Sequence, residues 1–301
     1  MVGYYKFISN TGKEDDLAIN EINSDKDVYN FYHSEERIVC NEIVVQDIDY
    51  TPVYKDDNLE KFYYLKSIIE KNIKSNLQIQ EIMTPEIIKS NDKLEELQKL
   101  FGLEKFNCND EYILSPASDF GVFSAYEGKK FEEKDIPLRV YEFARCYRIE
   151  DKKKDVLKRP TSFYLPDIHC FMEKDTYKEV LEHLKLYGKI LKEIKIPYFI
   201  ALRISEQEYN NNKEKICNIA KELKNNIIVN IVPSSIKYWE SKFKYIYKDS
   251  HNDFIQLSTV QVDYRTSKIF NIKVKGNNAE IIHSSIGSME RLLYAFLDKE
   301  E

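Results

Sequence analysis

One alternating stretch, RVYEFARCYRIE at residues 139–150, constrains the fold of this chain most strongly. Successive side chains of a β-strand point to opposite faces of a sheet, so every second residue shares a face. One face would carry aromatic and aliphatic side chains around Arg145. The other face would carry Val140, Glu142, Ala144, Cys146, Arg148 and Glu150. A half-exposed strand with its polar face in water would give this pattern, and so would a strand whose small residues leave room for a ligand.

A second alternating stretch, TSFYLPDIHCF at residues 161–171, follows after the charged segment DKKKDVLKRP. Asp167 and His169 are two residues apart and therefore lie on one face, which Phe163 shares. A guanidinium such as that of Arg148 suits a phosphate or a carboxylate, and a flat ring suits stacking. Arg159 stands just before this strand. The two strands together predict a ligand site on one sheet face, although a lone buried histidine is more often a hydrogen-bonded core residue.

Periodicity along the rest of the chain predicts an α+β fold, with antiparallel strands that carry polar residues and helices packed around them. Asp57 and Glu60 are placed to form a capping box for the first helix. Helices are expected over residues 56–73, 92–103, 176–194, 213–226 and 288–301. Strands are expected over residues 77–88, 195–205, 254–265 and 279–285, and residues 1–55 are expected to be β-rich.

Composition narrows the class of protein. With 301 residues, 43% of them hydrophobic, the chain can build one large domain or two small ones. The net charge of −6 argues against a strongly basic nucleic-acid-binding surface, but permits a local basic patch. The five cysteines form no C-x-x-C pair, which is typical of free thiols in a reducing compartment. The chain begins without a signal-peptide pattern and has no apolar run of about 20 residues, so we expect a cytoplasmic protein with no membrane partner.

Several segments, taken in order, resemble the class II aminoacyl-tRNA synthetases, and the threonyl-tRNA synthetase in particular. YEFARCYRIE and KRPTSFYLPDIHCF resemble the two halves of motif 2, and HSSIGSMERLLYAF resembles motif 3. IMTPEII resembles the proline-bearing motif 1, and FIQLSTVQVDY resembles the strand before motif 3. The resemblance covers residues 57–299 and implies a class II antiparallel sheet flanked by helices. It divides the chain into an N-terminal extension at residues 1–55 and a catalytic domain at residues 56–301.

The resemblance implies a role for each matching residue in the attack of an amino-acid carboxylate on ATP. Arg148 and Arg291 would be the catalytic residues, because they would hold the α-phosphate and cover the nucleotide. Glu150 would read adenine, Phe163 would stack on it, and Arg159 would reach the outer phosphates. Gln256 and Thr259 would line the nucleotide and amino-acid pocket, while Asp167 and Gln261 would contact the amino acid. Mg²⁺ would bridge the phosphates.

The family's zinc site is matched in part. His169 and His283 fall at the two zinc-binding histidines, but Asp119 stands where the family has a cysteine. Carboxylate oxygen is a zinc ligand, so these three residues could form an open zinc site. The alternative is a metal-free, hydrogen-bonded cluster. Trp239 and Leu165 replace a tyrosine and a glutamine of the family's amino-acid pocket, so the amino acid recognised need not be threonine.

Three functions remain open at this stage. We expect neither an anticodon-binding nor an editing domain, and the favoured function is therefore activation of an amino acid for a non-tRNA acceptor. That acceptor would be a carrier protein or a small-molecule amine. The first alternative is a minimal or split synthetase that charges tRNA through the basic motif 2 loop. The second is a non-catalytic regulatory paralogue. Residues 59–86 match the family's dimer-forming motif 1, which implies a homodimer.

Overall fold

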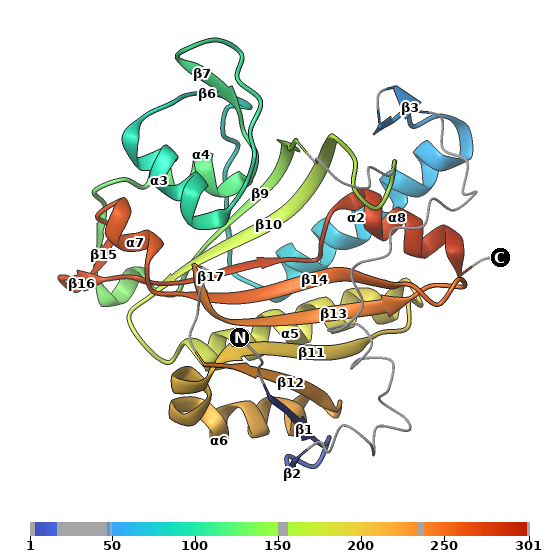
Figure 1. Ribbon diagram of the computed structural model, residues 1–301, viewed down its shortest axis with the longest axis vertical. Helices are drawn as coiled ribbons and strands as arrows, with labels where there is room; N and C mark the ends of the chain where they lie inside the picture. Colours follow the sequence, from blue (N-terminus) through green and yellow to red (C-terminus); the bar gives the residue numbers. More distant parts are fainter. Residues whose placement is uncertain (1–3, 17–46, 49, 150–155, 234–237, 300–301) are drawn as a thin grey trace.

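The computed structural model describes residues 4–16, 47–48, 50–149, 156–233 and 238–299, and a single large sheet dominates it (Figure 1). The strand order in this sheet is β2-β1-β12-β11-β13-β14-β17-β10-β9-β5. Its strands are β1 Tyr4–Ile8, β2 Glu14–Asp16, β5 Gln80–Glu81, β9 Leu138–Tyr147, β10 Ser162–Met172, β11 Phe199–Ser205, β12 Ile227–Val232, β13 Trp239–Lys248, β14 Phe254–Asp263 and β17 Glu280–Ser285.

The expected antiparallel sheet flanked by helices is confirmed, and it contains two parallel pairings. β11 pairs with β12 in parallel, and β5 pairs with β9 in parallel, so the sheet is mixed. A parallel neighbour needs a crossover connection, and helix α6, Glu206–Leu223, supplies it between β11 and β12. This helix begins seven residues before the expected start because Ser205 caps it, accepting a hydrogen bond from the backbone of Glu208.

The larger core lies between one face of this sheet and four helices. They are α2 Asp56–Asn76, α5 Thr176–Glu193, α6 and α8 Met289–Asp298. On α5, Val180, Leu184, Tyr187 and Leu191 recur at helical spacing and form a stripe that is fully buried. The predicted capping box of α2 is wrong: Lys55 occupies the N-cap without a side-chain hydrogen bond. Asp57 instead lies inside the first turn, where its negative charge is favourable beside the positive end of the helix dipole.

A smaller core lies on the opposite face, at one end of the sheet. It is built around α3 Asp92–Phe101, α4 Ser118–Ala125 and the residues that lead from α7, Thr266–Ile269. Short pairings complete this end: β6 Ile87–Lys89 with β7 Tyr112–Leu114, and β15 Lys273–Val274 with β8 Lys130–Phe131 and β16 Asn277–Asn278. A 3₁₀ turn covers Glu133–Asp135. The strand expected over residues 77–88 is broken near Pro85 into β5 and β6, which belong to different sheets.

The N-terminal residues belong partly to the main sheet. β1 pairs with β12 along its whole length, while β3 Asp47–Ile48 and β4 Thr51–Pro52 form a separate two-stranded pairing. Most of the β-rich stretch expected at residues 36–48 lies outside the described residues. Within the described ranges, no helix combines the length and the low polarity that crossing a membrane requires.

Candidate active site

A cavity of about 350 Å³ opens on the sheet face opposite the large core. With one exception, every predicted site residue that the structure describes lines this cavity, and Glu150 lies outside the described residues. The lining includes Asp119, Arg148, Arg159, Phe163, Leu165, Asp167, Trp239, Gln256, Thr259, Gln261, His283 and Arg291. The exception is His169, which is fully buried.

The register of β9 and β10 explains how the first of these residues come together. Cys146 pairs with Phe163, Ala144 with Leu165, and Glu142 with Asp167. The face inferred from alternation is therefore the face that carries the cavity. β9 ends at Tyr147, and Arg148 follows it with its backbone amide still bonded to Thr161.

Cationic side chains gather at one end of the cavity. Arg148 donates from Nε to the carbonyl oxygen of Pro116 at 2.8 Å, and its guanidinium lies 4.9 Å from the ring centroid of Phe163. Arg291 donates from Nε to the carbonyl of Lys158 at 2.7 Å. Burial and the nearby charge of Arg291 together lower the pKa of Arg159. Guanidinium groups that crowd one another in a partly buried site favour an anion between them.

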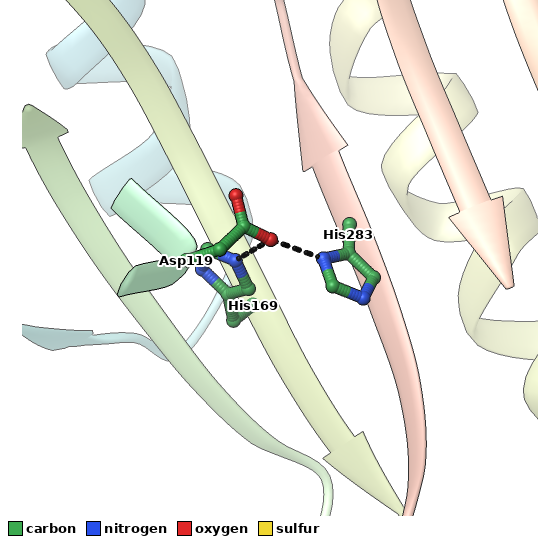
Figure 2. A group of neighbouring side chains, drawn as sticks. All are labelled: Asp119, His169 and His283. Carbon is green, nitrogen blue, oxygen red and sulfur yellow. Dashed lines mark hydrogen bonds and ion pairs between the residues drawn. The ribbon is translucent and has the colours of Figure 1, made fainter. Parts of the chain in front are cut away.

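Carboxylates and imidazoles occupy the other end. Burial raises the pKa of Asp167 to about 6, and its carboxylate accepts a hydrogen bond from the hydroxyl of Ser118, the first residue of α4. Asp119, the next residue on α4, lies between two histidines from neighbouring strands (Figure 2). Its Oδ1 is 3.1 Å from Nε2 of His169 and 2.7 Å from Nδ1 of His283. One carboxylate oxygen and two ring nitrogens, all of them possible metal ligands, therefore lie close together beside the cavity.

Contacts within the histidine cluster shift the pKa values of Asp119 and His283 in opposite directions. Burial disfavours a charge on Asp119, but His169 and His283 outweigh it and hold the pKa of this carboxyl well below its usual range. Burial likewise opposes a charge on His283, yet its hydrogen bonds to Asp119 and Asp263 raise the pKa of this histidine to about 10. The cluster thus combines anionic carboxylate with imidazole, a donor set that zinc accepts.

Sequence reasoning missed several residues of the site. Asp263 lies 2.9 Å from Nε2 of His283, and Tyr238 donates from its hydroxyl to Oε1 of Gln261 at 2.9 Å. Tyr238 also stacks on Phe101 with centroids 3.9 Å apart. The alternation of Phe243, Tyr245 and Tyr247 with lysines was the available signal for β13, the strand that begins directly after Tyr238. Tyr238 and Phe101, together with Trp239, give the cavity an aromatic wall.

Solved structures share this fold. A structure described as the RNA binding domain of threonyl-tRNA synthetase from Cryptosporidium parvum matches with a TM-score of 0.69 at 18% identity, covering 85% of this chain and 68% of that one. Prolyl-tRNA synthetase from Giardia lamblia in complex with prolyl-adenylate matches with a TM-score of 0.65 at 15% identity, covering 87% and 50%. The fold is therefore that of the class II synthetases.

Sequence comparison identifies the family. The model described as "tRNA synthetase class II core domain (G, H, P, S and T)" matches residues 101–300, and the chain belongs to this family. It is similar to the threonine–tRNA ligase of Methanopyrus kandleri, at 24% identity over 282 residues, covering 87% of this chain and 45% of the relative. The ligase of Methanococcus aeolicus is 32% identical over 205 residues, covering 64% and 32%. The chain is thus a threonyl-tRNA synthetase-like core that spans a third to a half of these relatives' length.

Proposed function

We propose that this chain activates an amino acid with ATP, forming an aminoacyl-adenylate and releasing pyrophosphate. The observation that carries the proposal is the separation of charge within one cavity: Arg148 lies beside Thr161, just before the start of β10, whereas Asp167 lies in the middle of that strand, opposite Glu142. A substrate with an anionic and a cationic end can enter such a cavity in only one favourable orientation. We propose residues 56–301 as the catalytic domain and residues 1–55 as its N-terminal extension.

In the proposed reaction, a carboxylate oxygen attacks the α-phosphorus of ATP. The new carboxyl O–P bond forms as the bond from Pα to the bridging oxygen breaks, and that electron pair leaves with pyrophosphate. Arg148 would neutralise the charge that develops on the α-phosphate, Arg159 would reach the outer phosphates, and Arg291 would cover the nucleotide. Mg²⁺, a hard cation that prefers oxygen ligands, would offset part of the negative charge of those phosphates. Asp167 would bind the amino group. Catalysis then needs positioning and charge stabilisation rather than a dedicated base.

We further propose that Asp119, His169 and His283 hold a zinc ion. The set fits the metal, because one carboxylate oxygen and two ring nitrogens face one another at 2.7 and 3.1 Å, and two of the three residues line the cavity. When bound, zinc would act as a Lewis acid that accepts the amino group or side chain of the substrate. The three residues themselves would orient that substrate beside Asp167 and exclude water from beneath it.

The test is amino-acid-dependent exchange of pyrophosphate into ATP, measured for each amino acid with and without added zinc. Exchange with one amino acid, or with a few related ones, supports activation, and Trp239 and Leu165 make threonine only one candidate. If no amino acid supports exchange, the proposed reaction is refuted and the regulatory paralogue is favoured. The zinc proposal is tested separately by metal analysis of the purified protein.

The acceptor of the activated amino acid is a separate prediction. Transfer to a carrier-protein thiol or a small-molecule amine remains the favoured case, and transfer to tRNA remains the alternative. Once the amino acid is known from the exchange assay, its labelled form can be offered to bulk tRNA and to simple amines. Efficient charging of tRNA would refute the non-tRNA acceptor while leaving activation intact.

A further inference from the structure

His283 lies between two carboxylates that differ in their surroundings. Its Nδ1 is 2.7 Å from Oδ1 of Asp119, which lines the cavity (Figure 2). Its Nε2 is 2.9 Å from Oδ2 of Asp263, which is fully buried at the end of β14. Nδ1 therefore faces the cavity, and Nε2 faces the protein interior.

The carboxylate of Asp263 is held rigidly by the residues that lead into α7. Its Oδ1 accepts hydrogen bonds from the backbone amides of Arg265 at 2.6 Å and Thr266 at 3.1 Å. Its Oδ2 accepts from the hydroxyl of Thr266 as well as facing His283. An ionised carboxylate can only accept hydrogen bonds, so the nitrogen of His283 that faces Asp263 must carry a hydrogen.

We infer that Asp263 is a positioning residue that fixes the tautomer of His283, so that Nδ1 is the nitrogen that ligates the metal. The inference rests on the zinc site of the proposed function. Nδ1 faces the carboxylate of Asp119 and the cavity, so zinc would displace the hydrogen on Nδ1 while the hydrogen on Nε2 stays with Asp263. Carboxylates that accept from the second nitrogen of a metal-bound histidine commonly orient the ring and strengthen its metal binding.

His169 lacks the same support. Its Nε2 faces Asp119, but its buried Nδ1 has no hydrogen-bond partner among the described residues. Among the described residues, a carboxylate outside the proposed ligand set therefore orients His283 but not His169. This asymmetry makes Asp263 the residue whose chemistry should control metal affinity from outside the ligand set.

The substitution Asp263→Asn tests the inference with a small change in shape. The backbone amides of Arg265 and Thr266 would keep the amide oxygen at the position of Oδ1, which turns the NH₂ group toward His283. That group donates, so Nε2 would become the acceptor and the hydrogen would move to Nδ1, where it blocks ligation. We expect zinc affinity, measured by competition with a chelator, to fall about 10- to 100-fold.

Glu208→Gln is the matched control. Glu208 is also a buried carboxylate, accepting from the hydroxyl of Tyr264, but it lies in α6 and does not line the cavity. We expect its zinc affinity to equal that of the wild type. Equal affinity in Asp263→Asn and the wild type would overturn the inference and leave the zinc site standing.

A second measurement does not depend on whether the variant folds. Nitrogen-15 NMR of the imidazoles in the zinc-loaded wild type should show hydrogen on Nε2 of His283 and metal on Nδ1. Coordination through Nε2 would overturn the inference directly. A wild-type protein that binds no zinc, even when zinc is added, would remove the proposed metal site and the inference with it, while pyrophosphate exchange would still report on activation.

Discussion

The guanidinium of Arg148 lies 4.9 Å from the ring centroid of Phe163, close enough for a cation–π contact. The two residues come from opposite sides of the loop between β9 and β10, and each has its own proposed partner on ATP. Arg148 is the proposed ligand of the α-phosphate, and Phe163 is the proposed stacking surface for adenine. Their contact means that the two parts of the nucleotide would be bound by one preassembled unit.

Arg148→Ala should therefore abolish pyrophosphate exchange, with a loss of about 100-fold or more, because the developing charge on phosphorus is left uncompensated. Thermal unfolding should change little, since the side chain is only half-buried. Arg145→Ala is the control. Arg145 lies on the other face, where Nε donates to the hydroxyl of Ser162 and the guanidinium packs on Tyr164. Exchange at the wild-type rate in Arg148→Ala would show that the motif assignment is wrong.

Zinc content should follow the chemistry of residue 119. Asp119→Ala removes one of three ligands, and we expect the purified variant to contain little or no zinc. Asp119→Cys supplies a thiolate, a softer ligand that zinc binds well, and should bind zinc more tightly than the wild type. Metal analysis and chelator competition measure both. Undiminished zinc in Asp119→Ala would place the metal elsewhere in the protein.

The stability of the protein should depend on the ionisation of Glu290. Burial raises the pKa of this α8 residue from 4.5 to about 7, against hydrogen bonds from the Tyr54 hydroxyl and the backbone amide of Tyr164. A raised pKa means that the folded state favours the protonated acid, so this contribution is complete below pH 4.5 and is lost as pH rises through about 7. The loss amounts to roughly 3 kcal/mol.

Glu290→Gln cannot ionise and should remove this part of the pH dependence. We expect the unfolding free energy of the variant, measured in urea, to rise relative to that of the wild type as the pH increases from 4.5 to 8. Glu96→Gln, on the exposed side of α3, should run parallel to the wild type throughout. A constant difference between Glu290→Gln and the wild type would contradict the prediction.

Gly121 of α4 should tolerate no larger residue. A methyl group there would lie 2.0 Å from Oγ1 and 2.4 Å from Cβ of Thr84. Gly121→Ala should cost about 1–3 kcal/mol of unfolding free energy, and the double variant with Thr84→Gly should recover part of it. Gly188→Ala in α5 is the control, because its nearest neighbour is the hydroxyl end of Tyr198 at 3.1 Å. A fully stable Gly121→Ala would mean that α4 can shift.

The predicted homodimer has a testable surface along α2 and β5. Tyr63 and Tyr64 of α2 are 59% and 50% exposed, and Met83, just beyond β5, is 92% exposed. Charged replacements in an apolar interface are unfavourable, so Tyr63→Glu combined with Met83→Glu should weaken the dimer at least about tenfold in sedimentation experiments. Tyr4→Ser, near the opposite edge of the sheet, should not. A wild-type protein that sediments as a monomer would refute the dimer.

The part of the site that sequence predicts is the part governed by local periodicity. A period of two places Glu142, Ala144 and Cys146 on one face, and the register confirms that they pair with Asp167, Leu165 and Phe163. The rest depends on contacts between distant segments. Asp263 reaches His283 because β14 and β17 are neighbours, and Phe101 reaches Tyr238 across more than a hundred residues of chain. The local spacing of residues along the chain predicts neither contact.

Parallel pairing was equally hidden. The run at Ile227–Val232 is apolar except for Asn230, as expected for a strand buried on both faces, but its length alone does not distinguish a strand from a short helix. Only the three-dimensional arrangement shows that it returns beside β11. The capping error at Asp57 has a simpler cause, since two aspartates in succession, Asp56 and Asp57, offer more than one possible helix start.

The pairing of β1 with β12 gives the first residues a protective role. β12 has β11 on one side, and on the other its backbone amides and carbonyls are matched by Tyr4–Ile8. Without β1, this apolar strand would present an open edge, the kind of surface through which sheets of separate molecules join into aggregates. Tyr4–Ile8 thus cover the edge of β12 and oppose self-association at the end of the sheet farthest from β5.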